Sequence, residues 1–582
     1  EGGMTPGRVA EALAAAGTAS LANAVLHVDW NQASIDSNRV CRDDVTPGEY
    51  VQWTPVELAY LNDWNVIYVP DGKDLDQIVA AQREALALTN GQPTAIVYRT
   101  HKGWQYGIEG RASHGAGHKL CSTGFYDALA GFMNDVAGKL PSCDANDRRC
   151  AGDDMAEVME ACFWESLTLI RDTIGQNTAM VRVLAARVVE SRARLDRLVR
   201  CARAGAPNLA TVFDHAARAG SETPAKLRLK PGDSTTLRGE LGNALNYYNS
   251  VSGGALLAAS ADLLGSTNTS HIAKGFPEGF FHMKDNAGAR LIAAGGICED
   301  AIAGIAAGIS AFGHHVGVGT SYAAFIAPLG HIAARLHAIA QQARHATRAK
   351  EPYKPLILVC AHASLKTGED GPTHADPQAL QLLQENFPRG TCLTLVPWDP
   401  QEVWPLISAA LAARPAIIAP FITRPNEVVL DREALNLAPV HACTTGVYRL
   451  RAARGTGDGT VVLQESGVTY AFLEDALPLI ERDDIDLNIY YVASAELFDA
   501  LSPAEQERIF PEAHAREAMG ITGFTVPTMW RWITSEHGRR ATLHPYKKGH
   551  YLGSGTADMV LAEAGLDGES QYKAIRQYLA EK

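Results

Sequence analysis

Short apolar runs recur through the middle of the chain, and stretches with a helical pattern separate them. Runs of this length, rich in Leu, Ile, Val and Ala, are typical of strands buried on both faces. Because strands and helices alternate, the strands are expected to lie parallel in one sheet with helices on its faces. The predicted strands are 255–259, 316–319, 356–361, 393–397 and 416–420, with helices such as 300–312 and 330–342 between them.

The same alternation continues at both ends of the chain. A chain of 582 residues is too long for a single hydrophobic core. We therefore predict an α/β protein of three consecutive domains with mainly parallel sheets, at 1–225, 226–430 and 431–582. The evidence for the first and third domains is a series of predicted elements. These are a helix that ends at Gly17, strands at 24–28, 93–98, 460–464 and 487–492, and helical stretches at about 152–219, 470–480 and 569–580.

Composition narrows the class of protein. The formal net charge is -13, and no basic stripe with interleaved aromatic residues is present, which argues against a nucleic-acid partner. No apolar run reaches the length of a membrane helix, and the amino terminus has no signal-peptide pattern. The cysteines are scattered, with only Cys143 and Cys150 close together, which favours a reducing compartment. We expect a cytoplasmic protein, with a lost targeting segment left open because Glu1 resembles an interior residue.

Polar residues stand at the ends of several predicted strands. In open parallel sheets, ligands collect at the carboxyl ends of the strands, where loops and helix amino termini converge. The same residue types also cap helices and close turns, so a structural role for each one remains open. The residues in question are Asn31, Asp262, Ser266, His362 and Arg424.

The most informative stretch runs from Gly368 to His374. It reads Gly-Glu-Asp-Gly-Pro-Thr-His and follows His362 closely. Two histidines and the carboxylate of Asp370 on a loop stiffened by glycine and proline suit proton transfer and hydroxyl recognition. Zinc binding is a weaker alternative, because the histidines lack close spacing and no cysteine pair accompanies them.

This stretch closely resembles the transketolase signature in the pyrimidine-binding domain of that family. Residues 1–31 are similar to the family's diphosphate- and metal-binding segment, 113–115 to its histidine loop, and 260–268 to its donor-phosphate segment. Several motifs in the expected order are more specific than any one of them. The resemblance covers the chain except for detail at about 120 to 230, and it implies the thiamine-diphosphate-binding fold with diphosphate-binding, pyrimidine-binding and carboxyl-terminal domains.

The resemblance implies a set of cofactor contacts. Glu299 resembles the glutamate that bonds to the aminopyrimidine ring, where a protonated carboxyl group would favour the reactive imino form. The alternative is that Glu299 only complements a helix dipole. In the family, a wall of aromatic residues stacks on the pyrimidine ring. In this chain the corresponding aromatic residues, Tyr322 and Phe325, are shifted by one position, and a further aromatic position of the family falls near Pro328. The implied cofactor-binding residues are Asn31, His114, Asp262, Glu299, Tyr322 and Phe325.

The resemblance also implies catalytic and substrate-binding roles. Histidines and Asp370 would handle proton transfer and hydroxyl selection, and arginines would form forked, charge-assisted bonds to a sugar phosphate. The implied catalytic residues are Glu299, His374, His362, His114 and Asp370. The implied substrate-binding residues are Arg238, Ser266, His362, Asp370 and Arg424.

The resemblance therefore implies the family's activity, in which a two-carbon ketol unit moves from a ketose phosphate to an aldose phosphate. The reaction would run through a thiamine-diphosphate carbanion and enamine, in the pentose phosphate pathway or the Calvin cycle. One alternative is an enzyme like deoxyxylulose phosphate synthase, which decarboxylates pyruvate. Another is a transketolase-like subunit without catalysis, which the altered aromatic wall would suit.

The family forms its sites between two subunits, so the resemblance implies a homodimer. It also implies a magnesium or calcium ion held by Asn31 and the backbone carbonyl of Ala33. The family's metal-binding aspartate lies before the first residue of this sequence. We therefore expect the chain to lack the amino-terminal part of its first domain, and a companion segment to supply that aspartate.

Overall fold

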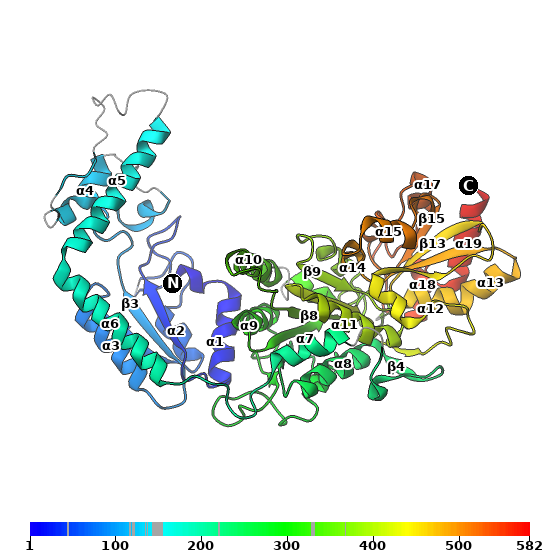
Figure 1. Ribbon diagram of the computed structural model, residues 1–582, viewed down its shortest axis with the longest axis horizontal. Helices are drawn as coiled ribbons and strands as arrows, with labels where there is room; N and C mark the ends of the chain where they lie inside the picture. Colours follow the sequence, from blue (N-terminus) through cyan, green and yellow to red (C-terminus); the bar gives the residue numbers. More distant parts are fainter. Residues whose placement is uncertain are drawn as a thin grey trace. The chain divides into compact units, whose positions relative to one another are not determined.

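The computed structural model forms two compact units. The first contains residues 1–13 and 21–206, and the second contains 14–20 and 207–582. Most of the helices and some of the strands are labelled in Figure 1. The structure describes residues 1–43, 46–115, 118, 123–133, 136, 138–141, 155–218, 222–327, 332–366 and 368–581. Cys143, Cys150 and Pro328, which entered the sequence argument, lie outside these ranges.

A parallel three-stranded sheet organises the first unit, with its strands in the order β1-β3-β2. Strands β1 (Val25–Trp30) and β3 (Thr94–Arg99) confirm the predicted strands at 24–28 and 93–98. Strand β2 (Asn65–Val69) was not predicted, and its side chains are mostly half-buried or exposed. Helix α1 (Gly7–Thr18) begins in this unit, and its residues from Ala14 onward belong to the second. The other helices, which include most of the predicted helical stretch, are α2 (Pro55–Leu61), α3 (Leu75–Ala87), α4 (Thr123–Met133), α5 (Met155–Gln176) and α6 (Thr178–Arg197).

A six-stranded parallel sheet forms the centre of the second unit, in the order β6-β5-β7-β8-β10-β9. All five strands predicted for the middle of the chain are present. The sixth, β6, is only two residues long. The strands are β5 (Leu256–Ser260), β6 (Leu291–Ile292), β7 (Val316–Tyr322), β8 (Leu356–Ala361), β9 (Cys392–Leu395) and β10 (Ile417–Ile422).

Helices cover both faces of this sheet, and alternate residues of β8 supply the two cores. Leu356 and Leu358 pack into the core that contains residues of α9 and α10. Ile357 and Val359 pack into the core that contains residues of α7, α8 and α11. This period of two is what a strand buried on both faces requires. The helices are α7 (Leu209–Arg218), α8 (Leu237–Val251), α9 (Glu299–Phe312), α10 (Ile332–Thr347) and α11 (Val403–Ala413).

A short antiparallel ribbon joins the start of this region to its end. Strand β4 (Ser234–Thr236) pairs with β11 (Asn426–Val428), with Thr235 opposite Glu427. Strand β4 leads directly into α8, because Thr236 caps that helix by accepting a hydrogen bond from Gly239 N. The ribbon therefore places the chain after β10 beside the first turn of α8.

The last part of the second unit contains a four-stranded sheet in the order β12-β14-β13-β15, in which only β12 is antiparallel. The predicted strands β13 (Gly459–Gln464) and β14 (Leu487–Val492) are confirmed, whereas β12 (Val447–Arg451) and β15 (Ala518–Thr522) were not predicted. The predicted helix at 470–480 is broken by a π-helical turn at Phe472–Ala476. The helices are α12 (Ser466–Ala471), α13 (Leu477–Arg482), α14 (Ala495–Asp499), α15 (Pro503–Ile509), α16 (Glu512–Arg516), α17 (Glu536–Ala541), α18 (Ala557–Ala564) and α19 (Gly568–Ala580).

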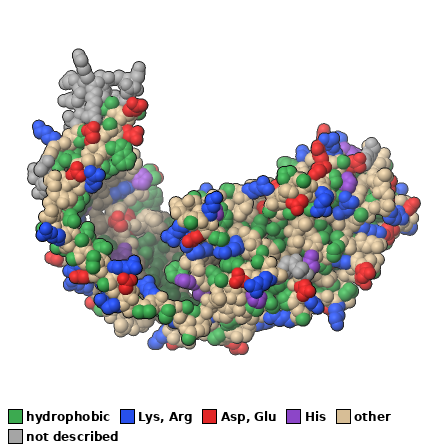
Figure 2. Space-filling model, in the orientation of Figure 1, with side chains coloured by type: hydrophobic (Ala, Val, Ile, Leu, Met, Phe, Trp, Pro, Cys, Tyr) green, Lys and Arg blue, Asp and Glu red, His purple; other side chains and the backbone are tan. Residues whose placement is uncertain are grey.

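Each of the three proposed domains contains one of these larger sheets, and the boundaries at 225/226 and 430/431 remain our proposal. On the face that Figure 2 shows, basic and acidic side chains of the described residues are intermixed. None of the helices in the described ranges is long and apolar enough to span a membrane.

Candidate functional site

His362 lies at the centre of a cluster of polar side chains in the second unit. It directly follows β8, its backbone is left-handed with φ 51°, and its side chain is only 1% exposed. Ring atom Nε2 lies 3.2 Å from the carbonyl oxygen of Ser266 and 3.2 Å from Nη1 of Arg238. Burial lowers the pKa of His362 to about 4, so the imidazole is neutral at pH 7.

Arg238 reaches this cluster from the first turn of α8. Its Nη1 donates a hydrogen bond to the carbonyl oxygen of Ser266. Its Nε is buried and has no hydrogen-bond partner among the described residues. Burial, together with the nearby charge of Arg424, lowers the pKa of Arg238. Two guanidinium groups that repel each other, one with an unused buried donor, favour an anion between them.

Arg424 approaches from the loop after β10. Its Nη1 lies 3.0 Å from Oε2 of Glu369 and 3.3 Å from Oδ2 of Asp370. The same Asp370 oxygen lies 3.4 Å from Nδ1 of His362. The loop between β8 and β9 and the loop after β10 therefore meet through two carboxylates, and that of Asp370 also approaches His362.

Aromatic rings form one wall of the cluster. The Tyr322 ring stacks on His362 with centroids 3.9 Å apart, and its hydroxyl donates to Oγ of Ser266 at 3.1 Å. The Phe325 ring lies 6.3 Å from Tyr322, and His374 meets both rings edge-on, at 5.7 Å from Tyr322 and 5.5 Å from Phe325. One face of Tyr322 is thus covered by His362, so Phe325 is the better placed of the two to stack on a ligand.

Glu299 begins α9 beside this wall. Its side chain is buried at 9% exposure, and Oε1 accepts a hydrogen bond from Oγ of Ser321 at 3.0 Å. Ser321 is the residue before Tyr322, which connects the carboxyl group to the aromatic wall. Asp262 follows β5 at the same edge of the sheet, with a left-handed backbone at φ 56° and an exposed side chain.

The structure therefore brings most of the predicted second-unit residues together. Contacts described above join eight of them into one network, to which Glu299 is linked through Ser321. The eight are Arg238, Ser266, Tyr322, Phe325, His362, Asp370, His374 and Arg424.

Asp262 stands outside this network, and the other predicted residues lie in the first unit. Asn31 and Ala33 follow β1, and Asn31 Oδ1 accepts a hydrogen bond from Ala33 N at 3.0 Å. The side-chain amide nitrogen of Asn31, Nδ2, donates a hydrogen bond to Oδ2 of Asp29 at 3.0 Å. His114 follows a short 3-10 helix, with Nδ1 3.1 Å from Nζ of Lys102. Among the described residues, no three His, Cys, Asp or Glu side chains cluster as a metal site would require.

A buried ionic cluster beside the site was missed by the sequence analysis. Lys366, on the loop between His362 and Asp370, lies 2.5 Å from Oε2 of Glu427, and Glu465 is buried nearby. Lys366 and Glu427 are far apart in the sequence, and neither belongs to a recognisable motif. The one feature of the sequence that pointed to this cluster was a lysine in the loop that carries the motif at 368–374.

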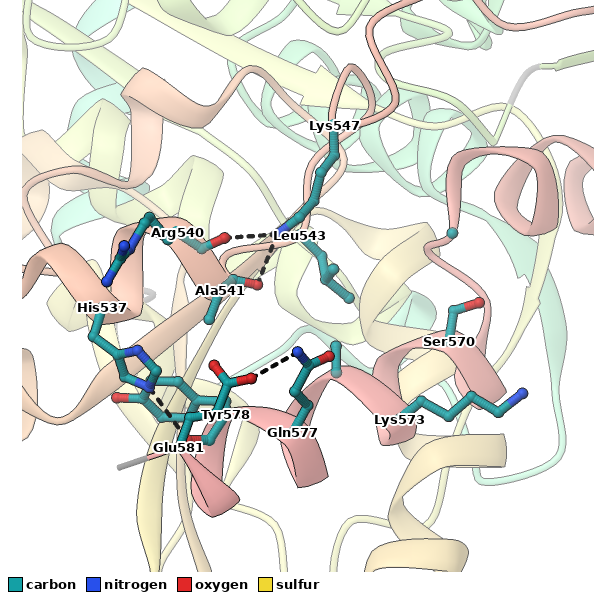
Figure 3. Close-up of a pocket in the computed structure, with 12 residues that line it drawn as sticks. His537, Arg540, Ala541, Leu543, Lys547, Ser570, Lys573, Gln577, Tyr578 and Glu581 are labelled. Carbon is teal, nitrogen blue, oxygen red and sulfur yellow. Dashed lines mark hydrogen bonds between the residues drawn. The ribbon is translucent and has the colours of Figure 1, made fainter.

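A separate pocket of about 650 Å³ lies between α17 and α19 (Figure 3). It contains none of the predicted site residues. Both of its lysines have local partners: Lys547 donates to the carbonyl oxygens of Arg540 and Ala541, and Lys573 pairs with Glu569. The chemistry that the sequence predicts therefore belongs to the sheet edge around His362.

The amino-acid sequence and the structure of this chain were compared with those of known proteins. Residues 235–426 match the family model "Transketolase, pyrimidine binding domain". The chain is 24% identical over 552 residues to transketolase 1 of Pasteurella multocida, covering 92% of this chain and 71% of the relative. It is 25% identical over 517 residues to the transketolase of Halalkalibacterium halodurans, covering 88% of this chain and 67% of the relative.

Solved structures show the same fold. A transketolase from Leishmania mexicana matches all of this chain and 75% of its own, with a TM-score of 0.69 and 20% identity. A Pichia stipitis transketolase, solved in complex with sedoheptulose 7-phosphate, matches over the same shares with a TM-score of 0.70 and 20% identity. The predicted resemblance and the predicted α/β fold are confirmed.

Proposed function

We propose that this relative of the transketolases transfers a two-carbon ketol unit from a ketose phosphate to an aldose phosphate. The observation that carries the proposal is the clustering of Arg238, Arg424, His362 and Ser266 at the carboxyl edge of the six-stranded sheet. The agreement of this geometry with roles inferred separately from sequence motifs supports it. We call these four residues the phosphate clamp.

The phosphate clamp has the chemistry that a phosphate monoester needs. A dianionic phosphate would offset the repulsion between Arg238 and Arg424 and would accept a hydrogen bond from the unpaired Nε of Arg238. The Ser266 hydroxyl and the neutral ring of His362 would add hydrogen bonds without further charge. The carboxylates of Glu369 and Asp370 hold Arg424 in place until phosphate binds.

Thiamine diphosphate is the cofactor that these residues fit. The buried carboxyl group of Glu299 has one oxygen bonded to Ser321, and it would hold the aminopyrimidine ring with its other oxygen, next to Phe325. Asn31 and the carbonyl of Ala33 would hold Mg²⁺ or Ca²⁺ and, through it, the diphosphate. When bound, thiamine diphosphate supplies a nucleophilic carbon that attacks the ketose carbonyl.

The remaining polar residues would position the sugar and move protons. His374 is held edge-on against Tyr322 and Phe325 and would exchange a proton with the sugar hydroxyl and carbonyl groups. His362 would bind a hydroxyl as a neutral ring, with Nδ1 facing Asp370. Asp370 would also select the hydroxyl configuration. His114 would take part in proton transfer, as the family resemblance implies.

We propose a homodimer with two sites, as the family resemblance implies. The first domain of one chain would hold the diphosphate, and the second domain of its partner would hold the pyrimidine ring. We also propose that the protein is cytoplasmic and acts in carbohydrate metabolism. Light scattering is expected to give the mass of a dimer, and an active monomer would contradict this assembly.

A paired assay tests the proposed reaction. The protein is supplied with thiamine diphosphate and Mg²⁺ and given either a ketopentose phosphate with an aldopentose phosphate, or pyruvate with an aldose phosphate. Ketol transfer without pyruvate decarboxylation is the expected result. Decarboxylation of pyruvate would instead favour the synthase-like alternative, and cofactor binding without either reaction would favour a non-catalytic subunit.

A further inference from the structure

Lys366 is a buried cation on the loop that carries His362 and Asp370. Its side chain is 12% exposed, and Nζ lies 2.5 Å from Oε2 of Glu427, whose side chain is 3% exposed. The ammonium group also lies 4.7 Å above the Tyr470 ring. A buried ammonium is costly unless it is paired. The loop is therefore held where its lysine meets Glu427.

Glu427 belongs to the ribbon that connects the two arginines of the phosphate clamp. It is the middle residue of β11, three residues after Arg424, and it lies opposite Thr235 of β4, three residues before Arg238. Its other oxygen, Oε1, accepts a hydrogen bond from Oγ of Ser466 at 3.3 Å. The carboxylate of Glu427 thus contacts the loop that follows His362, and it does so from a ribbon whose strands adjoin the segments of Arg238 and Arg424.

A second contact fixes the same loop from the four-stranded sheet. Ser364, with a left-handed backbone at φ 64°, donates its hydroxyl to the carbonyl oxygen of Gly523 at 2.7 Å. A Cβ atom at Gly523 would lie 2.3 Å from that hydroxyl oxygen, so the approach requires glycine. Glu465 also faces this region and is 2% exposed, with Oε2 accepting a hydrogen bond from Val468 N.

We infer that Lys366 is a positioning residue for the phosphate clamp. Its ion pair with Glu427 sets the distance between the His362 loop and the ribbon whose strands adjoin the segments of Arg238 and Arg424. The inference rests on the proposed function, because it assigns Lys366 to the clamp without any contact to substrate. Neither Lys366 nor Glu427 is among the residues inferred from the family resemblance.

Direct binding of inorganic phosphate to the full chain tests this role without cofactor or turnover. Isothermal titration calorimetry compares the unchanged protein with Lys366→Met, Glu427→Gln and Lys366→Arg. We expect Lys366→Met and Glu427→Gln each to weaken phosphate binding about tenfold, because a clamp residue displaced by a fraction of an ångström loses aligned bonds. Lys366→Arg should restore most of the affinity. Lys573→Met, which breaks an exposed ion pair with Glu569, is the matched control and should change nothing.

The sign of the Glu427→Gln effect separates positioning from charge. If Lys366 attracted phosphate by its charge alone, removing the neighbouring carboxylate would strengthen binding, and that result would overturn the inference. Unchanged affinity in Lys366→Met would overturn it as well. Failure of the unchanged protein to bind phosphate would instead contradict the proposed clamp itself.

A double variant guards against loss of folding. Lys366→Met/Glu427→Gln removes both charges, so no unpaired ion stays buried. Circular dichroism is expected to show a folded protein, with phosphate binding weakened no further than in the single variants. Additive weakening in the double variant would mean that the two residues act separately, which contradicts the inference.

Discussion

Oδ2 of Asp370 lies 3.4 Å from Nδ1 of His362, and the same oxygen lies 3.3 Å from Nη1 of Arg424. One carboxylate oxygen thus touches both a neutral imidazole and a guanidinium. The other ring nitrogen of His362, Nε2, faces Ser266 and Arg238. The predictions below follow from this arrangement and from the groups around it.

Glu299→Gln is expected to lower ketol transfer by about 100-fold or more, because it removes the acid that serves the aminopyrimidine ring at nearly constant volume. Circular dichroism should show the fold intact, and steady-state kinetics measures the loss. Asp300→Asn is the matched control, since Asp300 also stands in the first turn of α9. Equal losses in both variants would mean that Glu299 serves only the helix dipole.

Arg238→Ala and Arg424→Ala are each expected to weaken phosphorylated substrates by about 1.5–3 kcal/mol, the scale of a charge-assisted hydrogen bond. Unphosphorylated analogues should be barely affected, which a comparison of kcat/KM for both substrates measures. Arg171→Ala, at an exposed ion pair, is the control. Parallel losses on phosphorylated and unphosphorylated sugars would remove the argument for a phosphate clamp.

His362 is expected to titrate near its lowered pKa of about 4, well below the ordinary value of 6.5. The folded protein then binds fewer protons than the unfolded chain between these two values, so this group stabilises the fold above pH 6.5 and loses that contribution as the pH falls through 4. Histidine NMR measures the pKa. Titration of His362 near pH 6.5 would contradict the buried, neutral ring.

Tyr322→Phe is expected to cost about 0.5–1.5 kcal/mol of stability, because it deletes the hydrogen bond to Ser266 and keeps the stack on His362. Tyr322→Ala should in addition expose the imidazole and move the pKa of His362 toward its ordinary value. Denaturant unfolding and histidine NMR measure the two effects. An unchanged pKa in Tyr322→Ala would show that the ring does not shield His362.

The central sheet was predictable because its strands are continuous apolar runs that end at recognisable turns. Strand β8, predicted at 356–361, has those bounds in the structure. Strand β12 was missed because it is an antiparallel edge strand with arginines at two of its five positions, and β2 because its side chains are mostly half-buried or exposed. Burial by neighbouring elements, which the local pattern does not contain, decided these cases.

The site was predictable only where a motif carried it. His362, Asp370 and His374 belong to one signature, and the structure joins them with Arg238, which is distant in the sequence. The stack of Tyr322 on His362 and the pair of Lys366 with Glu427 had no local pattern. Such contacts depend on how β7, β8 and β10 lie side by side, which no single segment specifies.

The alternation of β8 between two cores has a consequence for how this site tolerates change. Leu356 and Leu358 face one core while Ile357 and Val359 face the other, and His362 follows the strand directly. A single-residue deletion within the strand would turn the side chains on one side of the deletion from one core to the other. The length of this strand is therefore constrained by the stability of the whole unit, separately from the contacts that fix the loop after it.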